Sequence, residues 1–510
     1  MTGKITKHVV TWISLLLIFQ LQASGRRAPV EENKIKESKV EEKKQIPPKQ
    51  TIAEHPDSLE FDALDWEIPL GTPYRSELEN GPVAYVAVDS SLPLINLQGY
   101  IRYGSLEDPA DKKGLGTLMS KLLRTGGTEK YQADSLDKLI DLLAMRFSFS
   151  QNESHISFKA SFLSENLNTA MNVMEQMFFH PTFQPEKIQK EKSILKQYVK
   201  HRFVNPEPVL KSAYNKLMYP KSDAARLISA ASLDSISRDD LVALHRKVFT
   251  NREIVISASG KFNRNEMVTR LNRIFSPVAE HEEKKEPEIK VNPELKALVV
   301  DKKINQAYVR MGLPLFKRPH PDYYSVSILN LILGGGGFNS RLATRIRSDE
   351  GLTYSIYSHS ESNYLYPGTL YINFYTKSQS FSRAVTLVLQ ELQKIREEGV
   401  TKQELENART TYISQLPSMF RSPEDIVSTY AMNEFFGRSP DHYRKYPKAL
   451  RSITQDDVQN AAKKYLNLSE IRYSIVGDTG ALFDKSGDFF SLDSLKEKKV
   501  ISTDSLPSLP

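Results

Sequence analysis

Hydrophobic and polar positions along the chain follow two periods, and the order of these periods is alike in two halves. Apolar residues that alternate with polar ones predict strands, and apolar residues spaced three and four apart predict helices. In the first half these patterns predict strands at residues 83–88, 94–103 and 147–162, and helices at 114–123, at 134–144 and from residue 165 onward. The chain is therefore expected to be an α+β protein.

An internal repeat supports the division into two halves. Residues 235–260 align without a gap on residues 452–477, at an offset of 217 residues. Each copy contains an amphipathic helix, a short polar turn and a strand that ends at Gly. A second, shorter repeat, Tyr-x-Arg-x-Gly, occurs at residues 100–104 and 308–312. A repeat of this length is too long for a solenoid and predicts a duplicated α+β domain.

The first residues carry the features of a secretory signal peptide. Lys4 and Lys7 precede an almost uninterrupted apolar run at residues 9–21, and small residues follow it. The run is too short to span a bilayer comfortably, so residues 1–25 are predicted to be removed without leaving a transmembrane anchor. The sequence contains no cysteine, which excludes disulfides, thiolate metal sites and a lipidated N-terminal cysteine. The mature protein is expected to be exported and periplasmic.

Composition divides the rest of the chain into two folded halves and three polar segments. Residues 26–57 form a charged leader with too little apolar surface to fold. A charged, proline-punctuated linker at 278–293 separates an N-terminal half, 58–277, from a C-terminal half, 294–480. The tail, 481–510, is expected to end loosely. The net charge of +7 arises from 69 basic and 62 acidic side chains without a basic stripe, so nucleic acid is not an expected partner.

Four consecutive glycines form the most unusual stretch of the sequence. They are Gly334, Gly335, Gly336 and Gly337, and they follow an apolar run. Residues without a side chain let the backbone adopt conformations closed to other residues and let another chain approach closely, as at a substrate channel. The stretch is therefore a candidate glycine-rich binding loop.

A short basic helix is predicted directly after the glycines. Asn339 and Ser340 can cap its start, Arg341, Arg345 and Arg347 recur along it, and Gly351 ends it. Arginines are also common near helix ends because they complement the helix dipole. Residue types alone therefore leave a purely structural interpretation open.

The sequence around these glycines resembles a known family. His-Pro-Asp-Tyr at residues 320–323, Ser-Arg-Leu at 340–342 and Glu-Gly-Leu-Thr-Tyr at 350–354 are similar to the C-terminal half of the pitrilysin/insulinase zinc metallopeptidases, the M16-like inverzincins. In that family an Arg and a Tyr seven residues later, matching Arg347 and Tyr354, hold the substrate backbone beside the zinc. The resemblance implies two metallopeptidase-like halves, each of two similar α+β modules, that form a clam around a cavity.

The zinc motif of this family is degenerate in the present chain. Active members read His-x-x-Glu-His on one helix, whose two imidazoles bind zinc and whose Glu activates a water molecule. Thr117, Ser120 and Lys121 occupy the matching positions. A hydroxyl is a poor lone zinc ligand, Ser120 is no base near neutral pH, and the Lys121 ammonium repels a divalent cation. Glu191 resembles the family's third ligand but is expected on a solvated helix face. No metal site or catalytic residue is therefore expected on this chain alone.

Two functions from different classes remain open at the level of sequence, and whether the chain takes part in an enzyme is undecided. The first is an inactive subunit of an exported heterodimeric zinc metallopeptidase, similar to mitochondrial processing peptidase-like pairs. The partner would carry the zinc, and this chain would contribute Arg347, Tyr354 and part of the chamber wall to peptide hydrolysis. The alternative is a purely structural or peptide-binding relative without a proteolytic role. Because Arg347 and Tyr354 are both retained in an otherwise intact motif, the first function is favoured.

Overall fold

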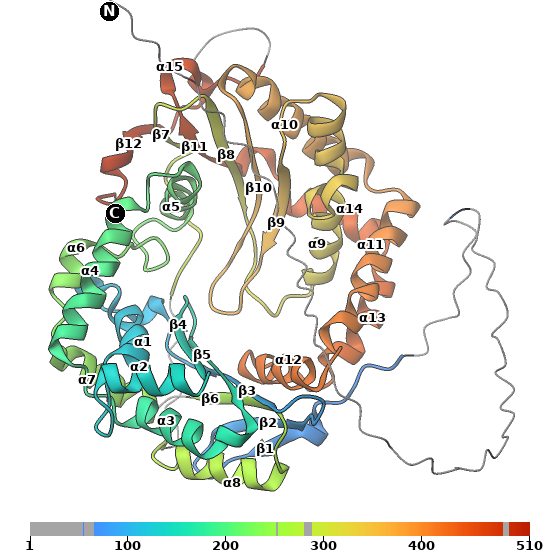
Figure 1. Ribbon diagram of the computed structural model, residues 1–510. Coiled ribbons are helices and arrows are strands. Elements are labelled where there is room, and N and C mark those ends of the chain that lie inside the picture. Colours follow the sequence, from blue (N-terminus) through green and yellow to red (C-terminus); the bar gives the residue numbers. More distant parts are fainter. Residues whose placement is uncertain (1–54, 56–65, 251–252, 280–287, 483–488, 510) are drawn as a thin grey trace, which may run out of the picture. The chain divides into compact units, whose positions relative to one another are not determined.

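A computed structural model describes most of the chain after residue 65 (Figure 1). The described residues are His55, 66–250, 253–279, 288–482 and 489–509. The predicted signal peptide, 1–25, and the charged leader, 26–57, lie outside them apart from His55. The chain divides into two compact units, Met1–Asp65 and Trp66–Pro510, and the architecture below is that of the second.

The first half is built on a six-stranded sheet. Its strands have the order β1-β2-β6-β3-β5-β4. Strand β6 lies inside the sheet, and all seven of its residues are buried, which is why its sequence is almost continuously small or apolar. The strands are β1 (Arg75–Glu77), β2 (Val83–Val88), β3 (Leu94–Ile101), β4 (Arg146–Gln151), β5 (Ile156–Leu163) and β6 (Ile254–Gly260).

The second half repeats this arrangement around another six-stranded sheet. Its order is β12-β7-β11-β8-β10-β9, so β11 takes the place of β6 and β8 that of β3. The two copies of the sequence repeat end in β6 and β11, which confirms the duplicated α+β organisation. The strands are β7 (Ala297–Asp301), β8 (Gln306–Pro314), β9 (Ile356–Glu361), β10 (Thr369–Lys377), β11 (Arg472–Gly477) and β12 (Lys498–Ser502).

The two sheets differ at one edge. In the first half β1 precedes β2 in the chain and pairs with it antiparallel. In the second half the matching edge strand is β12, which comes from the end of the chain and pairs parallel with β7. Ile501 and Leu506 are buried here. The expectation of a loose C-terminal end is therefore wrong for residues 505–509, because Leu506 and the partly buried Leu509 pack at this sheet edge.

Helices surround both sheets. Those of the first half are α1 (Leu115–Thr125), α2 (Ala133–Leu142), α3 (Leu167–Phe179), α4 (Pro185–His201), α5 (Pro206–Met218), α6 (Ala230–Asp234), α7 (Arg238–Thr250) and α8 (Arg264–Phe275). Those of the second half are α9 (Tyr323–Asn330), α10 (Phe381–Glu398), α11 (Lys402–Ser414), α12 (Pro423–Phe435), α13 (His442–Ser452), α14 (Gln455–Tyr465) and α15 (Thr479–Leu482). None of the described helices is long and apolar enough to cross a membrane.

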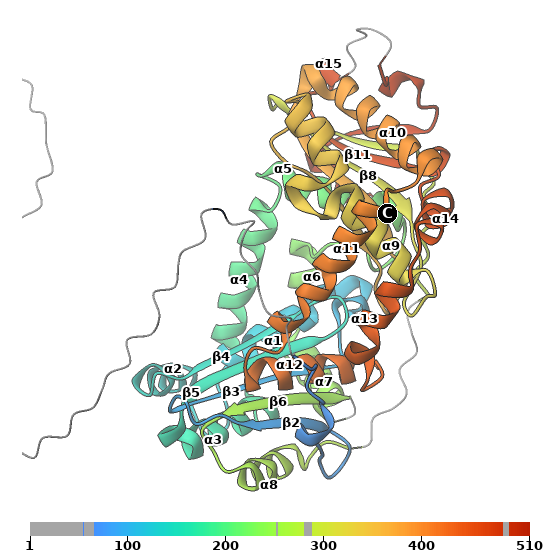
Figure 2. The same cartoon turned by 90° about the vertical axis from the view of Figure 1, so that its right-hand side faces the viewer.

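One helix from each half packs on the sheet of the other half. Helix α12 packs on β6, β2 and β3 of the first sheet, and α5 packs on β11, β7 and β8 of the second (Figures 1 and 2). Phe435 of α12 is fully buried, with its ring centroid 5.5 Å from that of Tyr100 of β3. Because the exchanged helices share hydrophobic clusters with the sheets they cover, the two halves are packed together through their cores.

One predicted strand of the first half is divided in the structure. The alternating run at 147–162 forms β4 and β5, which pair antiparallel across a tight turn. In this turn the Asn152 side-chain oxygen accepts the backbone N–H groups of Ser154 and His155, each at 2.9 Å. The prediction of one continuous strand is wrong here, because this Asn turn reverses the chain without interrupting the alternation.

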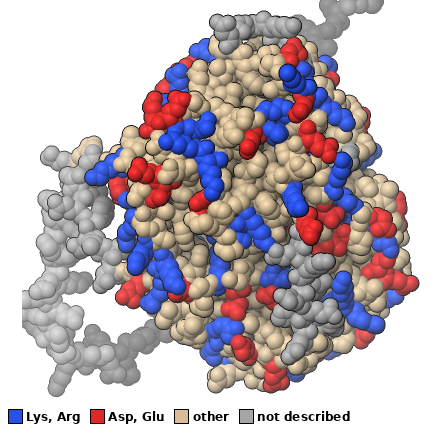
Figure 3. All heavy atoms as spheres, turned by 180° about the vertical axis from the view of Figure 1, so that it is seen from behind, with Lys and Arg blue, Asp and Glu red and all other residues tan. Residues whose placement is uncertain are grey.

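Charged side chains of opposite sign are mixed on the face turned away from the view of Figure 1. Figure 3 shows Lys and Arg interspersed with Asp and Glu over this face. The mixture agrees with the nearly balanced totals of 69 basic and 62 acidic residues. Opposite charges are therefore distributed together here instead of separating into a basic and an acidic region.

Candidate functional site

Gly351 brings the end of the basic helix and the following strand together. Residues Ala343–Asp349 form a helical segment of π type, and Gly351 takes a left-handed conformation with φ +61°. The Leu352 N–H then donates to the Ile346 carbonyl at 3.0 Å and closes the helix end. The predicted helix and its glycine stop are confirmed. The predicted side-chain cap by Ser340 is wrong, because its hydroxyl donates to the Gly337 carbonyl at 2.7 Å instead.

Two threonines fix the chain that leads from Gly351 into β9. The Thr353 hydroxyl donates to the Tyr375 carbonyl of β10 at 2.6 Å, and the Thr376 hydroxyl donates to the Leu352 carbonyl at 2.6 Å. Thr353 is buried, whereas the next residue, Tyr354, is 77% exposed. The anchoring therefore directs the Tyr354 ring outward beside the helical segment.

Arg347 lies between two exposed aromatic rings. Its guanidinium carbon is 4.0 Å from the ring centroid of Phe338, which follows the four glycines, and 5.2 Å from that of Tyr354. Such stacking holds the planar guanidinium while leaving N–H donors at its edge available. The sequence analysis paired Arg347 with Tyr354 but missed Phe338. The place of this aromatic residue directly after the glycine run was the only sign of its role.

The other two arginines of this segment are engaged by carboxylates. Arg341 Nε donates to Glu404 Oε1 at 2.7 Å, and Arg345 Nη1 lies 3.4 Å from Glu350 Oε1. Within the described residues Arg347 has no carboxylate partner. The structural interpretation therefore fits Arg341 and Arg345, whereas Arg347 contacts only aromatic rings among the described residues.

The glycine run packs against the edge of the second sheet. A β-carbon at Gly334 would lie 2.4 Å from the Ser358 nitrogen of β9, so no larger residue fits there without displacing the strand. Gly335, Gly336 and Gly337 are exposed. Gly334 and Gly335 end the helical segment Leu331–Gly335, so the predicted loop begins only after them, while the last three glycines are open to solvent.

Helix α1 presents the degenerate zinc positions in the first half. Its apolar residues are buried against the sheet, and Ser120 is 1% exposed. The Ser120 hydroxyl donates back to the Gly116 carbonyl at 2.8 Å, and the Thr117 hydroxyl donates to Gln151 Oε1 at 2.9 Å. Lys121 is partly exposed on the same helix. Both hydroxyls are therefore committed to hydrogen bonds within the protein.

A buried carboxylate that sequence reasoning did not single out fixes the start of α1. Asp108 accepts the N–H groups of Gly114 at 2.9 Å and Gly116 at 3.1 Å, and the Tyr103 hydroxyl at 3.0 Å. Burial raises the pKa of Asp108, and these donors oppose the rise. An acid shortly before a helix start was its only sequence signal. Since Gln151 Nε2 also donates to Asp108, at 3.2 Å, Thr117 belongs to a structural network.

Glu191 does not lie on a solvated face. It is 7% exposed on α4, and its Oε1 is 3.2 Å from the Thr125 hydroxyl of α1. The expected solvated position is therefore wrong, because α4 packs this side of the helix on α1. No group of three or more His, Cys, Asp or Glu side chains able to hold a metal occurs among the described residues. With committed hydroxyls at two positions and an ammonium at the third, the residues present do not fit a zinc ion.

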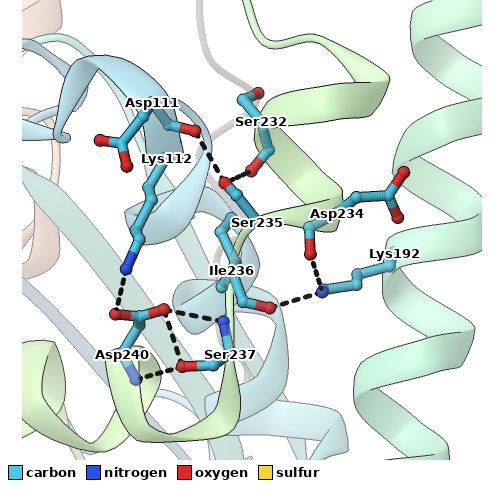
Figure 4. A network of polar contacts seen from close by, with 9 residues as sticks. All are labelled: Asp111, Lys112, Lys192, Ser232, Asp234, Ser235, Ile236, Ser237 and Asp240. Atoms are coloured by element: carbon cyan, nitrogen blue, oxygen red, sulfur yellow. Dashed lines mark hydrogen bonds and ion pairs between the residues drawn. The ribbon is translucent and has the colours of Figure 1, made fainter.

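A polar network holds α4, which carries Glu191, in place (Figure 4). The Lys192 ammonium donates to the Ile236 carbonyl at 2.5 Å in the loop between α6 and α7, and burial lowers the pKa of Lys192. The same loop is tied to the segment before α1, because the Ser235 hydroxyl donates to the Asp111 carbonyl at 2.7 Å. Lys192 is therefore a structural residue, and the network fixes α4 relative to the start of α1.

Both halves match models of one protein family. Residues 92–230 match the model described as Insulinase (Peptidase family M16). Residues 235–412 match the model described as Peptidase M16 inactive domain. The first match contains the degenerate positions of α1 and Glu191, and the second contains the glycine run, Arg347 and Tyr354.

Individual relatives resemble the chain over most of its length. YmxG of Bacillus subtilis, named an uncharacterized zinc protease, is 24% identical over 71% of this chain and 87% of its own. A Helicobacter pylori relative named non-peptidase homolog YmxG is 23% identical over 74% and 87%. The crystal structure of a peptidase M16 inactive domain from Pseudomonas fluorescens superposes with a TM-score of 0.71 at 21% identity, over 79% of this chain and 98% of that one. The names of these relatives thus include both a protease and a non-peptidase.

Proposed function

This chain belongs to the insulinase family of peptidases, family M16, and we propose that it serves there as a subunit without catalytic zinc. In this proposal a zinc-competent relative is the partner, the two chains form a heterodimer, and the complex hydrolyses peptides. This chain contributes substrate-binding groups and part of the wall around the substrate. The zinc belongs to the partner, because Thr117 and Ser120 are committed to internal hydrogen bonds and Lys121 carries a positive charge.

The proposal rests on the guanidinium of Arg347, which stacks on two aromatic rings and has no carboxylate partner among the described residues. A planar cation beside the Tyr354 phenol can hold a peptide carbonyl and share negative charge that develops on its oxygen during hydrolysis. Phe338 and Tyr354 both contact the guanidinium, so its orientation is restricted before a substrate arrives. A relative with only a structural role would not need this exposed arrangement.

Export to the periplasm is part of the same proposal. It rests on the basic residues and the short apolar run before residue 25. A partner would then be sought among zinc-competent relatives that carry a similar export signal. The cellular fraction that contains the full-length gene product, expressed with its own N-terminus, tests this part separately.

Affinity purification from the native cell envelope tests the assembly. The full chain with a C-terminal tag is expected to retain a relative with an intact His-x-x-Glu-His motif, across an interface of at least about 1,000 Å². Mixing the two purified chains should then produce peptide cleavage that neither chain gives alone. If every zinc-competent relative from the same cell leaves the chain monomeric in size-exclusion chromatography and cross-linking, the heterodimer is excluded. The structural or peptide-binding alternative would then hold.

A further inference from the structure

A pocket beside the glycine run contains an arginine without an acidic partner. It has a volume of about 560 Å³, and its lining includes Arg318, Tyr323, Asn330, Gly334 and part of β9. The Arg318 guanidinium carbon is 3.8 Å from the ring centroid of Tyr323 and 4.6 Å from that of Tyr364. Within the described residues this guanidinium has no hydrogen bond or ion pair. The two rings therefore hold a flat cation whose N–H groups remain unused.

The charges around Arg318 do not compensate it. Asp322, the nearest acid in the sequence, accepts from Lys464 at 2.7 Å and from the Tyr465 hydroxyl at 2.5 Å. Arg438 adds a second cation, since its Nε donates to the Tyr364 hydroxyl at 2.7 Å. Burial and the two nearby arginines lower the pKa of His442 to about 4, so this imidazole is neutral near pH 7. The surroundings of the pocket thus favour an anion.

An unsatisfied polar group lines the same pocket. Asn330 is 7% exposed, and its Oδ1 has no hydrogen-bond partner in the described part of the chain. Buried acceptors are normally paired, and this oxygen has almost no accessible surface, so a ligand donor reaches it only when the Asn330 side chain turns toward the pocket. Arg318 and Asn330 come from opposite ends of the segment that includes α9. The pocket therefore combines a free cation with an amide side chain that supplies an acceptor when it turns, the complement of a carboxylate next to an amide N–H.

We propose that this pocket binds a carboxylate group of a peptide, with the Arg318 guanidinium as its counter-ion and the Asn330 side chain beside the adjoining amide. The inference rests on the peptide-binding role proposed above and deepens it by naming a carboxylate as the group that is recognised. A pocket of this volume accommodates several peptide atoms besides the carboxylate. The carboxylate can belong to an Asp or Glu side chain or to a peptide C-terminus.

Binding of fluorescently labelled peptides to the full chain, without a partner, tests the pocket. One peptide carries a central Glu and an amidated end, a second has Gln in its place, and a third has Gln and a free C-terminal carboxylate. The Glu or the free-end peptide is expected to bind roughly ten- to a hundredfold more tightly than the amidated Gln peptide, which is the scale of a charge-assisted hydrogen bond. The tighter of the two identifies the source of the carboxylate.

Arginine variants decide whether Arg318 is responsible. Arg318→Gln is expected to abolish the preference for the carboxylate, and Arg318→Lys to retain part of it, because the charge remains but the planar fork is lost. Arg421→Gln is the matched control, since Arg421 is 73% exposed and lies on the surface. Thermal melts check that each variant is folded. Equal binding of all three peptides, no binding of any, or an unchanged preference in folded Arg318→Gln would overturn the inference.

The outcome is separable from that of the subunit proposal. A reconstituted pair that cleaves peptides without any preference for a carboxylate refutes only the pocket. A chain that binds acidic peptides through Arg318, but adds nothing to cleavage by any relative, refutes only the catalytic role. In the second case the chain is a peptide-binding protein.

Discussion

Arg347 and Tyr354 lie together in space, with 5.2 Å between the guanidinium carbon and the ring centroid, although they belong to a helical segment and to the turn after it. Two features produce this contact. Gly351 ends the helical segment in a left-handed conformation, and the Thr353 hydroxyl fastens the returning chain to the Tyr375 carbonyl. The pair therefore depends on local backbone geometry that is independent of any partner.

Gly351→Ala is expected to disturb this geometry. The φ of +61° disfavours a side chain by about 1–2 kcal/mol, although the space around the missing β-carbon is open. Gly437 has a φ of +62° and equally open space, so Gly437→Ala is a control with the same backbone strain. Both variants should lose similar stability in urea titrations. Only Gly351→Ala should change the arginine Nε–H signal of Arg347 in NMR spectra, because the ring of Tyr354 moves; an unchanged signal would mean that Gly351 does not position the pair.

Much of this architecture could be predicted from the sequence, because its signals are local. The repeat at 235–260 and 452–477 identified two equivalent halves, and the glycine run with Arg347 and Tyr354 indicated a candidate site. The exchange of α5 and α12 between the halves could not be predicted, since a helix's apolar stripe does not specify which sheet it covers. Contacts such as that between Glu191 and Thr125 could not be predicted either, because they depend on how two helices pack together.

Acid pH should weaken the attachment of the basic segment to α11. Burial alone would raise the pKa of Glu404, but hydrogen bonds from Arg341 and from Thr401 outweigh it and hold this pKa at about 2. The folded-state pKa lies below the ordinary value of 4.5, so the stabilisation is complete above pH 4.5 and is lost as the pH falls toward 2. The free energy of unfolding of Glu404→Gln, measured by urea titration, should therefore fall less than that of the wild type as the pH is lowered from 4.5 toward 2. Glu186→Gln, at an exposed position, is the control. If the free energy of unfolding of Glu404→Gln fell with pH as steeply as that of the wild type, the role of Glu404 would be contradicted.

The exchanged helix α12 should couple the two halves. Phe435 is fully buried against the first sheet, and the guanidinium carbon of Arg102 lies 4.1 Å from its ring centroid. Phe435→Ala is expected to lower the free energy of unfolding by about 3–5 kcal/mol, the usual cost of a large cavity. Leu142→Ala, at a side chain that is 81% exposed, should have little effect. A loss as small for Phe435→Ala as for Leu142→Ala would show that α12 is not part of the shared core.

The purified chain should hold no stoichiometric zinc. Thr117, Ser120 and Lys121 offer no imidazole, and the Lys121 ammonium repels the ion. Introducing the family motif by Thr117→His, Ser120→Glu and Lys121→His should destabilise the protein by about 1–3 kcal/mol, because Ser120 is 1% exposed and a longer side chain overpacks its site. Elemental analysis combined with thermal melts measures both effects. One tightly held zinc per wild-type chain would refute this expectation.

The central claim is that Arg347 and Tyr354 assist hydrolysis at a zinc ion carried by a partner. The most direct measurement is kcat for peptide cleavage by the reconstituted pair, with Arg347→Ala and Tyr354→Phe compared against wild type and against Arg421→Gln. Both site variants should assemble normally and lower kcat by roughly 10²-fold, the effect of losing one donor to the transition state, while Arg421→Gln leaves it unchanged. Wild-type kcat in correctly assembled Arg347→Ala and Tyr354→Phe pairs would contradict the account and make these residues structural.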